Sequence, residues 1–174
     1  MMRVRSNALV LGLALALGVA TPVAAQSPGE ATARGMVGTL VDGMVLGAEQ
    51  GGLSPESMPE FLSCMEEGAS DELVPIVQRL LEQAFTAEEL GTLDAHFASP
   101  LAALSRRATI EKLRIEYGAT VDAPVTLTAE QRAALDAFGA TPLGERVWSV
   151  GFTDDQPDPQ MKSAAMSLLD KCHG

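Results

Sequence analysis

Thr86-Ala87-Glu88-Glu89 opens a stretch of the chain that is written a second time 42 residues further on, from Thr128-Ala129-Glu130-Gln131. The pattern continues with Leu93-Asp94-Ala95 and Ser99-Pro100-Leu101 in the first copy, and with Leu135-Asp136-Ala137 and Thr141-Pro142-Leu143 in the second. The offset is constant, so neither copy has gained or lost a residue between these motifs. Each copy reads as a short helix, a break and another helix. A duplicated helical hairpin of this kind predicts an all-α domain.

The helix boundaries of the two copies carry the same signals. A Thr followed three residues later by Glu or Gln forms a capping box, and a Ser or Thr directly before Pro caps a helix that starts at that Pro. These cap and break positions are Thr86, Glu89, Ser99, Pro100, Thr128, Gln131, Thr141 and Pro142. We expect a helix–Ser/Thr-Pro–helix unit over residues 86–118 and again over residues 128–151, with residues 119–127 as the linker.

The rest of the chain also has helical periodicity. Apolar residues recur at three- and four-residue steps over residues 31–49 and again over residues 159–172, so each segment predicts one amphipathic helix. Between them, Ser54-Pro55 predicts the start of a helix that ends at Gly68, and Ser70-Asp71-Glu72 predicts the cap of the next one. We therefore predict a compact bundle of about eight short helices and no confident strand.

The N-terminus has the layout of a secretory signal peptide. Arg3 and Arg5 precede an uncharged apolar run over residues 8–20, and Val23-Ala24-Ala25 offers the small residues of a cleavage site. An uncleaved anchor is the alternative, but the apolar run is shorter than the roughly 20 residues that span a bilayer. We expect residues 1–25 to be removed near Ala25. The mature domain, residues 26–174, would then be periplasmic or secreted, without stable membrane insertion.

The two cysteines of the chain are Cys64 and Cys172. An even pair in an exported protein is most simply a disulfide, although two free thiols, or one reactive thiol, are the alternatives. The bond would tie an early helix to the C-terminal helix and close a long loop. In the chain-entropy model, a loop of about 100 residues contributes about 4–5 kcal/mol to stability.

The charge of the chain narrows the choice of partners. It has 12 basic and 23 acidic residues, a formal net charge of −11, and removal of two N-terminal arginines would leave about −13. Nucleic acid needs a basic face on the protein, so it is not an expected partner. The excess of acidic residues either serves to keep the protein soluble or attracts a basic envelope protein.

The two copies also resemble a known signature. Phe85, Thr86, Glu88, Glu89, Leu90, Phe97, Ser99, Pro100 and Leu101 are similar to the pattern of a bacterial periplasmic family called domain of unknown function 2059, and the second copy matches at Leu127, Thr128, Glu130, Phe138, Thr141, Pro142, Leu143 and Gly144. The resemblance covers roughly residues 80–150, and the first copy departs from it at Ala102, where the family has Gly. It implies a small exported helical domain and no assigned activity.

Few residues suggest chemistry. His96 could act as a general base, but its counterpart in the second copy is Phe138, which favours a packed side chain. Asp170, Cys172 and His173 could form part of a metal site, but such a site needs three or four convergent ligands and a disulfide would consume Cys172. Two acidic groups lack the spacing of a calcium-binding loop and suit helix ends and turns; they are Glu66, Glu67, Asp71 and Glu72, and Asp154, Asp155 and Asp158. We expect no catalytic, cofactor or metal residues.

These observations favour an exported, non-enzymatic accessory or binding protein of the cell envelope. Two alternatives stay open. One is a periplasmic inhibitor or immunity protein that binds a basic toxin or lytic enzyme, and steep salt dependence of binding would mark it. The other is an envelope hydrolase with an unrecognised acid pair, which needs paired carboxylates of shifted pKa in a pocket.

Overall fold

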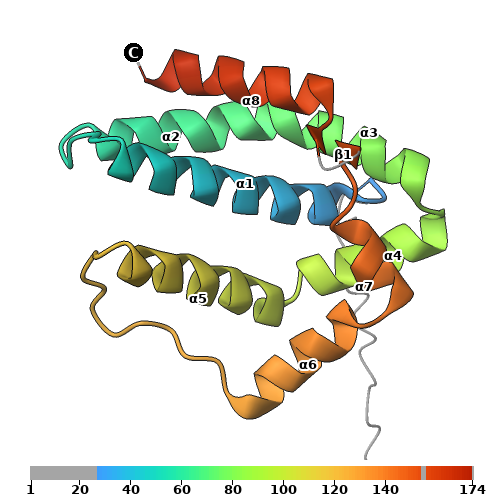
Figure 1. Cartoon of the computed structure of the whole chain (residues 1–174). Coiled ribbons are helices and arrows are strands. Elements are labelled where there is room, and N and C mark those ends of the chain that lie inside the picture. The colour runs from blue at the N-terminus through green and yellow to red at the C-terminus, as the bar shows by residue number, and fades with distance from the viewer. Residues whose placement is uncertain (1–26, 154–155, 174) are drawn as a thin grey trace, which may run out of the picture.

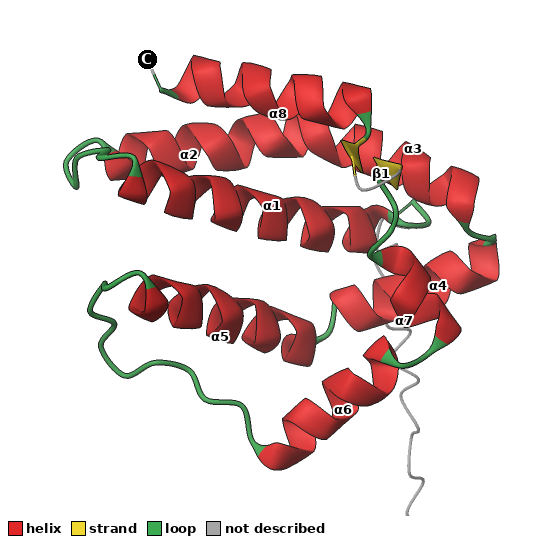
Figure 2. Cartoon of the chain, in the orientation of Figure 1, coloured by secondary structure: helices red, strands yellow, loops and turns green. Residues whose placement is uncertain are grey.

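The computed structural model describes residues 27–153 and 156–173, and these residues form a mostly helical, all-α fold as predicted (Figures 1 and 2). The elements are α1 (Glu30–Gln50), α2 (Met58–Gly68), the π-helical turn η1 (Ala69–Leu73), α3 (Val74–Ala84), α4 (Ala87–Phe97), α5 (Pro100–Glu116), α6 (Ala129–Gly139), α7 (Pro142–Val147), β1 (Phe152–Thr153), β2 (Gln156–Pro157) and α8 (Pro159–Cys172). The predicted signal peptide lies outside the described residues. No helix within the described ranges is long and apolar enough to cross a membrane.

Helix α1 lies at the centre of the molecule, between the α2–α3 layer and α5 (Figure 1). Its N-terminus has no cap from its own sequence. Instead, the Asp94 carboxylate on α4 accepts hydrogen bonds from the Gly29 N–H at 2.7 Å and the Thr32 N–H at 2.9 Å, as well as from the Thr32 hydroxyl at 2.8 Å. These N–H groups have no partner inside the helix. Asp94 therefore joins α4 to the start of α1, a contact that the sequence analysis missed.

Residues 58–84 form one uninterrupted helical run, which corrects the prediction of two helices separated at Gly68. The run continues because η1 inserts an extra residue: the Val74 N–H donates to the Ala69 carbonyl five residues earlier. Pro75 follows directly and cannot donate a hydrogen bond, and its ring clashes with the carbonyl four residues earlier in a regular helix. The wider π turn accommodates that ring. The described residues thus form seven helical runs, not about eight.

Two other predicted boundaries also need correction. Ser54-Pro55 does not start α2, because residues 55–57 form a turn and the helix begins at Met58. The Ser54 carbonyl accepts from the N–H groups of Ser57 and Met58, both at 3.1 Å, so Ser54 closes that turn. Ser70-Asp71-Glu72 does not cap a helix, because all three residues lie within η1. The Ser54-Pro55 signal marks a real turn just before α2, whereas residues 70–72 mark no helix start.

Helices α2 and α8 pack together, and the predicted disulfide joins them. Cys64 on α2 and Cys172 on α8 are bonded, with 5.6 Å between their Cα atoms and a sequence separation of 108. One turn further along, Gly68 lets the two helices approach closely, because a Cβ there would come within 2.2 Å of a Leu168 methyl group. Leu168 is fully buried. Gly68 therefore serves helix packing and does not end a helix.

The core lies between α1, the α2–α3 run, α4 and α8. It contains mostly aliphatic side chains, as the scarcity of aromatics predicts, and its fully buried large members are Phe61, Met65, Leu73, Leu81, Leu93, Val147 and Leu168. Among the described residues, this core includes no side chain from α5 or from the linker that follows it. The two copies of the repeated motif therefore differ in their relation to the core.

Both copies nevertheless form the same local structure. Thr86 with Glu89, and Thr128 with Gln131, make complete capping boxes at the starts of α4 and α6, and both helices have 11 residues. The breaks match too: Ser99 has φ −73° and ψ 148°, and Thr141 has φ −77° and ψ 149°. Their side chains accept from the N–H groups three residues later, at 3.1 and 3.0 Å. The predicted caps and breaks are confirmed at all eight positions.

The linker between the copies is held to α5 by a buried acid. Residues 118–128 have no regular structure, as expected. The Glu111 carboxylate, on a residue only 8% exposed, accepts from the Val125 N–H at 2.6 Å and from Arg107 at 2.6 Å. These two hydrogen bonds, from Val125 first, lower the pKa of Glu111. The linker is thereby tied back to α5 before the chain enters α6.

Candidate functional site

A groove between α1, α5 and α6 is the candidate functional site. Residues 35–43 of α1, 102–113 of α5 and 135–139 of α6 contribute its walls, and residues 96–97 and Trp148 contribute one end. We call it the aromatic groove. Its volume is about 430 Å³, within the range of about 300–1,000 Å³ that is usual for small-molecule sites. Figure 1 shows α1 and α5 running side by side, with α6 below them.

Four rings gather at one end of the aromatic groove. His96 stacks face to face on Phe138, with 3.5 Å between ring centroids and 8° between planes. The edge of the Phe97 ring lies against Trp148, with centroids 5.9 Å apart. Trp148 is 53% exposed, and an exposed large apolar side chain beside a groove is typical of a binding surface. The ring cluster therefore supplies apolar contact area that the folded chain leaves partly in water.

Gly35 makes room for the ring cluster. A Cβ at this position would lie 2.5 Å from the Phe97 ring, so no larger residue fits without moving it. Gly35 therefore lets the side chain of Phe97, which lines the groove, approach α1 closely.

The charges in the aromatic groove neutralise each other. Arg106 on α5 holds the Asp42 carboxylate on α1 through two guanidinium nitrogens, one of them at 2.9 Å. The hydrogen bond with Asp42 raises the pKa of Arg106, so the guanidinium stays charged. Burial lowers the pKa of His96, which is therefore neutral at pH 7. The groove presents one internal ion pair and a neutral imidazole, a lining suited to an uncharged ligand.

Helix α5 is attached to α1 by two ion pairs, one of which lies in the groove. Besides the Arg106–Asp42 pair, Arg114 contacts Glu49 at 2.6 Å. Glu111 is the buried residue of α5, and it faces the linker. The apolar side chains of α5, such as Ile110 and Leu113, line the groove without joining the core. Since exposed apolar area favours burial, α5 presents a face that a ligand could cover.

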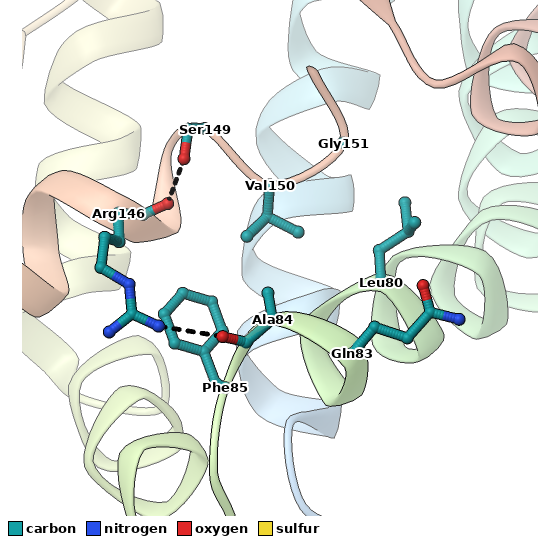
Figure 3. Close-up of a pocket in the computed structure, with 8 residues that line it drawn as sticks. All are labelled: Leu80, Gln83, Ala84, Phe85, Arg146, Ser149, Val150 and Gly151. Carbon is teal, nitrogen blue, oxygen red and sulfur yellow. Dashed lines mark hydrogen bonds between the residues drawn. The ribbon is translucent and has the colours of Figure 1, made fainter. Parts of the chain in front are cut away.

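Another pocket lies where α7 meets the junction of α3 and α4 (Figure 3). Its volume is about 290 Å³, and its charged residue is Arg146. That guanidinium donates to the Ala84 carbonyl at 2.9 Å, pairs with Glu89 at 2.7 Å and lies 4.6 Å from the centre of the Phe85 ring. Three protein groups thus contact the Arg146 guanidinium, although its side chain is still 49% exposed. We interpret this pocket as the joint that holds α7 in place.

The structure separates the other residues that suggested chemistry. His96 lies in the aromatic groove, packed against Phe138, in line with the expectation from the repeat. Cys172 is in the disulfide and His173 lies against the Phe61 ring, so neither completes a metal site. Within the described residues, no three His, Cys, Asp or Glu side chains are grouped to hold a metal ion. Two acids of the second acidic group, at positions 154 and 155, lie outside the described residues.

Sequence reasoning missed the aromatic groove because its residues come from five separate segments. One signal was available: the repeat aligns His96 with Phe138, and residues at equivalent positions of two copies can meet where the copies face each other. Comparison with family models, with curated proteins and with solved structures finds no match to this chain. The resemblance to the domain of unknown function 2059 therefore stays a prediction that rests on the motif residues.

Proposed function

We propose that this protein is an exported, non-enzymatic binding protein of the cell envelope, and that the aromatic groove holds a small apolar ligand. The observation that carries the proposal is an elongated groove whose lining is apolar and aromatic and whose charges cancel. The signal-peptide pattern of residues 1–25 supports export, and the disulfide suits an oxidising compartment. Binding at such a site would bury apolar surface, without any bond being made or broken.

The lining favours binding over hydrolysis. A hydrolase of the kind considered above needs two carboxylates that share a pocket. Among the described residues that line the aromatic groove, Asp42 is the single acid, and Arg106 occupies it. His96 is stacked on the Phe138 ring, and the acid of the lining is paired with Arg106 and does not orient His96 as a base. The groove thus supplies contacts for a ligand more readily than groups for proton transfer.

The duplication is a further part of the proposal. We propose that residues 86–118 and 128–151 descend from one helix–Ser/Thr-Pro–helix unit. The constant offset, the matching torsions of Ser99 and Thr141 and the stacking of His96 on its counterpart Phe138 support this view. An experimental structure in which residues 86–101 and 128–143 do not superpose would overturn it.

The binding function can be tested with an uncharged fluorescent probe. The full chain is expressed with its own N-terminus, recovered from the exported fraction and titrated with N-phenyl-1-naphthylamine, whose emission rises in apolar surroundings. We expect saturable binding of one probe per chain. The intact mass of the recovered protein tests cleavage near Ala25 in the same sample.

Two glycines of α1 provide a matched pair of variants. Gly43 lines the aromatic groove and Gly47 does not, yet a Cβ at either position meets no atom within 4 Å. Both substitutions to Leu improve helix propensity by about 1 kcal/mol, but only Gly43→Leu fills the groove. We expect probe affinity to fall at least tenfold in Gly43→Leu and to stay unchanged in Gly47→Leu. Absence of saturable binding, or equal binding by both variants, contradicts the proposal.

The alternative of an inhibitor rests on the net charge of −11. It predicts capture of one stoichiometric basic envelope protein that is lost on raising the salt concentration, because such an attachment is electrostatic. If the purified pair forms with the same affinity in Gly43→Leu while the probe fails to bind the parent chain, the inhibitor function replaces the one proposed here.

A further inference from the structure

We propose that helix α5 is a lid over the aromatic groove, hinged at Ser99 and latched to α1 by two ion pairs. Its role in ligand entry rests on the proposed binding function, whereas the motion itself does not. The inference follows from the way α5 is attached, from the different packing at the two breaks and from a strained residue in the linker.

Helix α5 is attached to α1 by charged side chains at the surface. Its buried residue is Glu111, which faces the linker, whereas α1 buries six residues. The pairs Arg106–Asp42 and Arg114–Glu49 join the two helices, and their side chains are 25% to 42% exposed. Exposed ion pairs contribute little to stability and are screened by salt. Within the described residues, the core includes no side chain of α5, so this helix can separate from α1 while the core stays intact.

Ser99 is the hinge because the main-chain hydrogen bonds of two helices meet there. Its N–H donates to the His96 carbonyl at 3.0 Å at the end of α4, and its carbonyl accepts from the Ala103 N–H at 3.3 Å at the start of α5. Pro100, directly after it, has no N–H to donate. Rotation about the backbone of Ser99 therefore moves α5 relative to α4 without breaking a main-chain hydrogen bond of either helix.

The second break, at Thr141, is packed more tightly and keeps α6 in place. A Cβ on Gly144 would lie 2.2 Å from the Phe138 carbonyl oxygen, so the start of α7 lies directly against the end of α6. The counterpart of Gly144 in the first copy is Ala102, whose Cβ excludes an equally close contact between α5 and the end of α4. Phe138 is also stacked on His96 of α4. We therefore expect α5 to move and α6 to stay.

The linker at the other end of α5 contains a strained residue. Ala123 has φ 50°, a left-handed conformation that its Cβ disfavours, and it directly precedes Pro124, which restricts it further. The Glu111 carboxylate accepts from the Val125 N–H, two residues later, at 2.6 Å. Such strain persists only where surrounding contacts impose it, and it is common in switch regions. Breaking that hydrogen bond as α5 moves lets the linker relax, which offsets part of the cost of opening.

Movement of α5 would open the aromatic groove from one side. The helix supplies one wall of the groove, including Ile110, Leu113 and the latch residue Arg106. The walls on α1 and α6 stay in place, because α1 belongs to the core and α6 is held at the second break. A ligand would enter when the latch breaks and would be covered when it forms again. Access to the groove should therefore increase with ionic strength.

Hydrogen exchange followed by mass spectrometry tests the motion without any ligand. We expect the amides of α5 to exchange at least tenfold faster than those in the middle of α1. Arg114→Met removes one latch, and it should speed exchange in α5 by about fivefold, which is the most that one exposed pair contributes. Lys112→Met is the matched control, because it removes the same charge from the same helix but its partner, Glu116, also lies on α5. It should leave exchange in α5 within about twofold. Exchange in α1 should not change in either variant.

Labelling of an introduced thiol tests access to the groove. The two cysteines of the chain are bonded to each other, so Gly43→Cys supplies a single thiol in the groove lining, at a position where a Cβ meets no atom within 4 Å. Its reaction with N-(1-pyrenyl)maleimide, a bulky uncharged reagent, should speed up as salt rises from about 0.01 M to about 1 M. Adding Arg114→Met should speed labelling at low salt by about fivefold. Gly47→Cys, outside the groove, should react at a rate that neither change alters.

Exchanging the two charges of a latch separates the ion pair from other effects of the substitution. Arg114→Glu and Glu49→Arg should each speed labelling of the groove thiol, and the two together should restore the slow rate. The lid inference fails if labelling is equally fast in all variants, or if exchange in α5 and α1 rises together, which would indicate global unfolding. Probe binding without lid motion overturns this inference alone. Lid motion without probe binding overturns the proposed function and leaves the motion established.

Discussion

The segments 86–101 and 128–143 have the same caps, the same helix length and the same break, yet one is embedded in the core and the other lies at the edge of the molecule. Helix α4 buries Leu90 and Leu93, whereas α6 has no buried residue. The counterpart of Leu90 is the exposed Arg132. The capping motif, which spans a few residues, thus determines where each helix starts. Whether the helix is buried depends on the apolar side chains that it carries elsewhere.

The largest expected difference between the copies is at their shared leucine. Leu93 is fully buried, and its counterpart Leu135 is half-buried in the wall of the aromatic groove. We expect Leu93→Ala to lower the free energy of unfolding by about 3 kcal/mol, and Leu135→Ala by about 1 kcal/mol because less area is lost. Urea denaturation followed by circular dichroism measures both. Equal losses would show that the second copy is as embedded as the first.

The shared aspartate should give the next largest effect. Asp94 accepts three hydrogen bonds at the start of α1, whereas Asp136 is exposed. Asp94→Ala leaves two helix-terminal N–H groups and a buried hydroxyl without their acceptor, and it should cost about 2 kcal/mol. Asp136→Ala should change stability by less than about 0.5 kcal/mol.

Asp94→Asn provides the control for this aspartate, because the amide keeps an acceptor oxygen at nearly the same place. We expect it to lose less stability than Asp94→Ala does. Hydrogen exchange should locate the loss at the first turn of α1. If protection instead falls evenly over the whole molecule, the aspartate does not act as the remote cap described above.

The smallest effect is one of pH, at the third residue of each capping box. The Thr86 N–H, and then Arg146, lower the pKa of Glu89, while the equivalent Gln131 does not titrate. Because the folded pKa is below the unfolded one, near 4.5, Glu89 contributes stability above that pH. The contribution is lost as the pH falls through the folded pKa.

Urea midpoints at pH 7 and pH 3 test this comparison. Glu89→Gln should lower the midpoint at pH 7, and the difference from the parent chain should shrink toward pH 3, because Glu89 takes up a proton as the pH falls through its lowered pKa. Gln131→Glu should introduce a weaker dependence of the same sign, because no arginine is paired with that position. A midpoint difference that does not change with pH would show that the carboxylate charge of Glu89 contributes nothing.

Features of the fold that depend on contacts close in sequence were mostly predicted, whereas those that depend on contacts distant in sequence mostly were not. The capping boxes, the Ser-Pro and Thr-Pro breaks and the start of α8 at Pro159 all follow from contacts within four residues, and they were predicted. The disulfide was predicted from the cysteine count and the expected compartment. The passage of one helix through Gly68 was not, because a glycine commonly ends a helix and nothing in the local pattern indicates the π turn η1 that carries the run on to Pro75.

The candidate site is the least predictable part for the same reason. Ile110 and Leu113 look like core residues in the sequence, and only the position of α5 relative to α1 makes them groove residues. That position is set by Arg106–Asp42 and Arg114–Glu49, two pairs about 65 residues apart in sequence, which no local pattern indicates. The groove becomes visible only when α1, α5 and α6 are placed together.

The disulfide between α2 and α8 also imposes an order on the assembly of the molecule. Cys172 lies on the last of the described helices, so Cys64 must wait as a thiol while α3 to α7 are made. During that time α1, which precedes Cys64, is not enclosed by the covalent ring and remains free to settle against α4 through Asp94. The disulfide can form only after α8 has packed against α2. A gel-shift assay that follows the loss of free thiols over time would therefore report when the fold is complete.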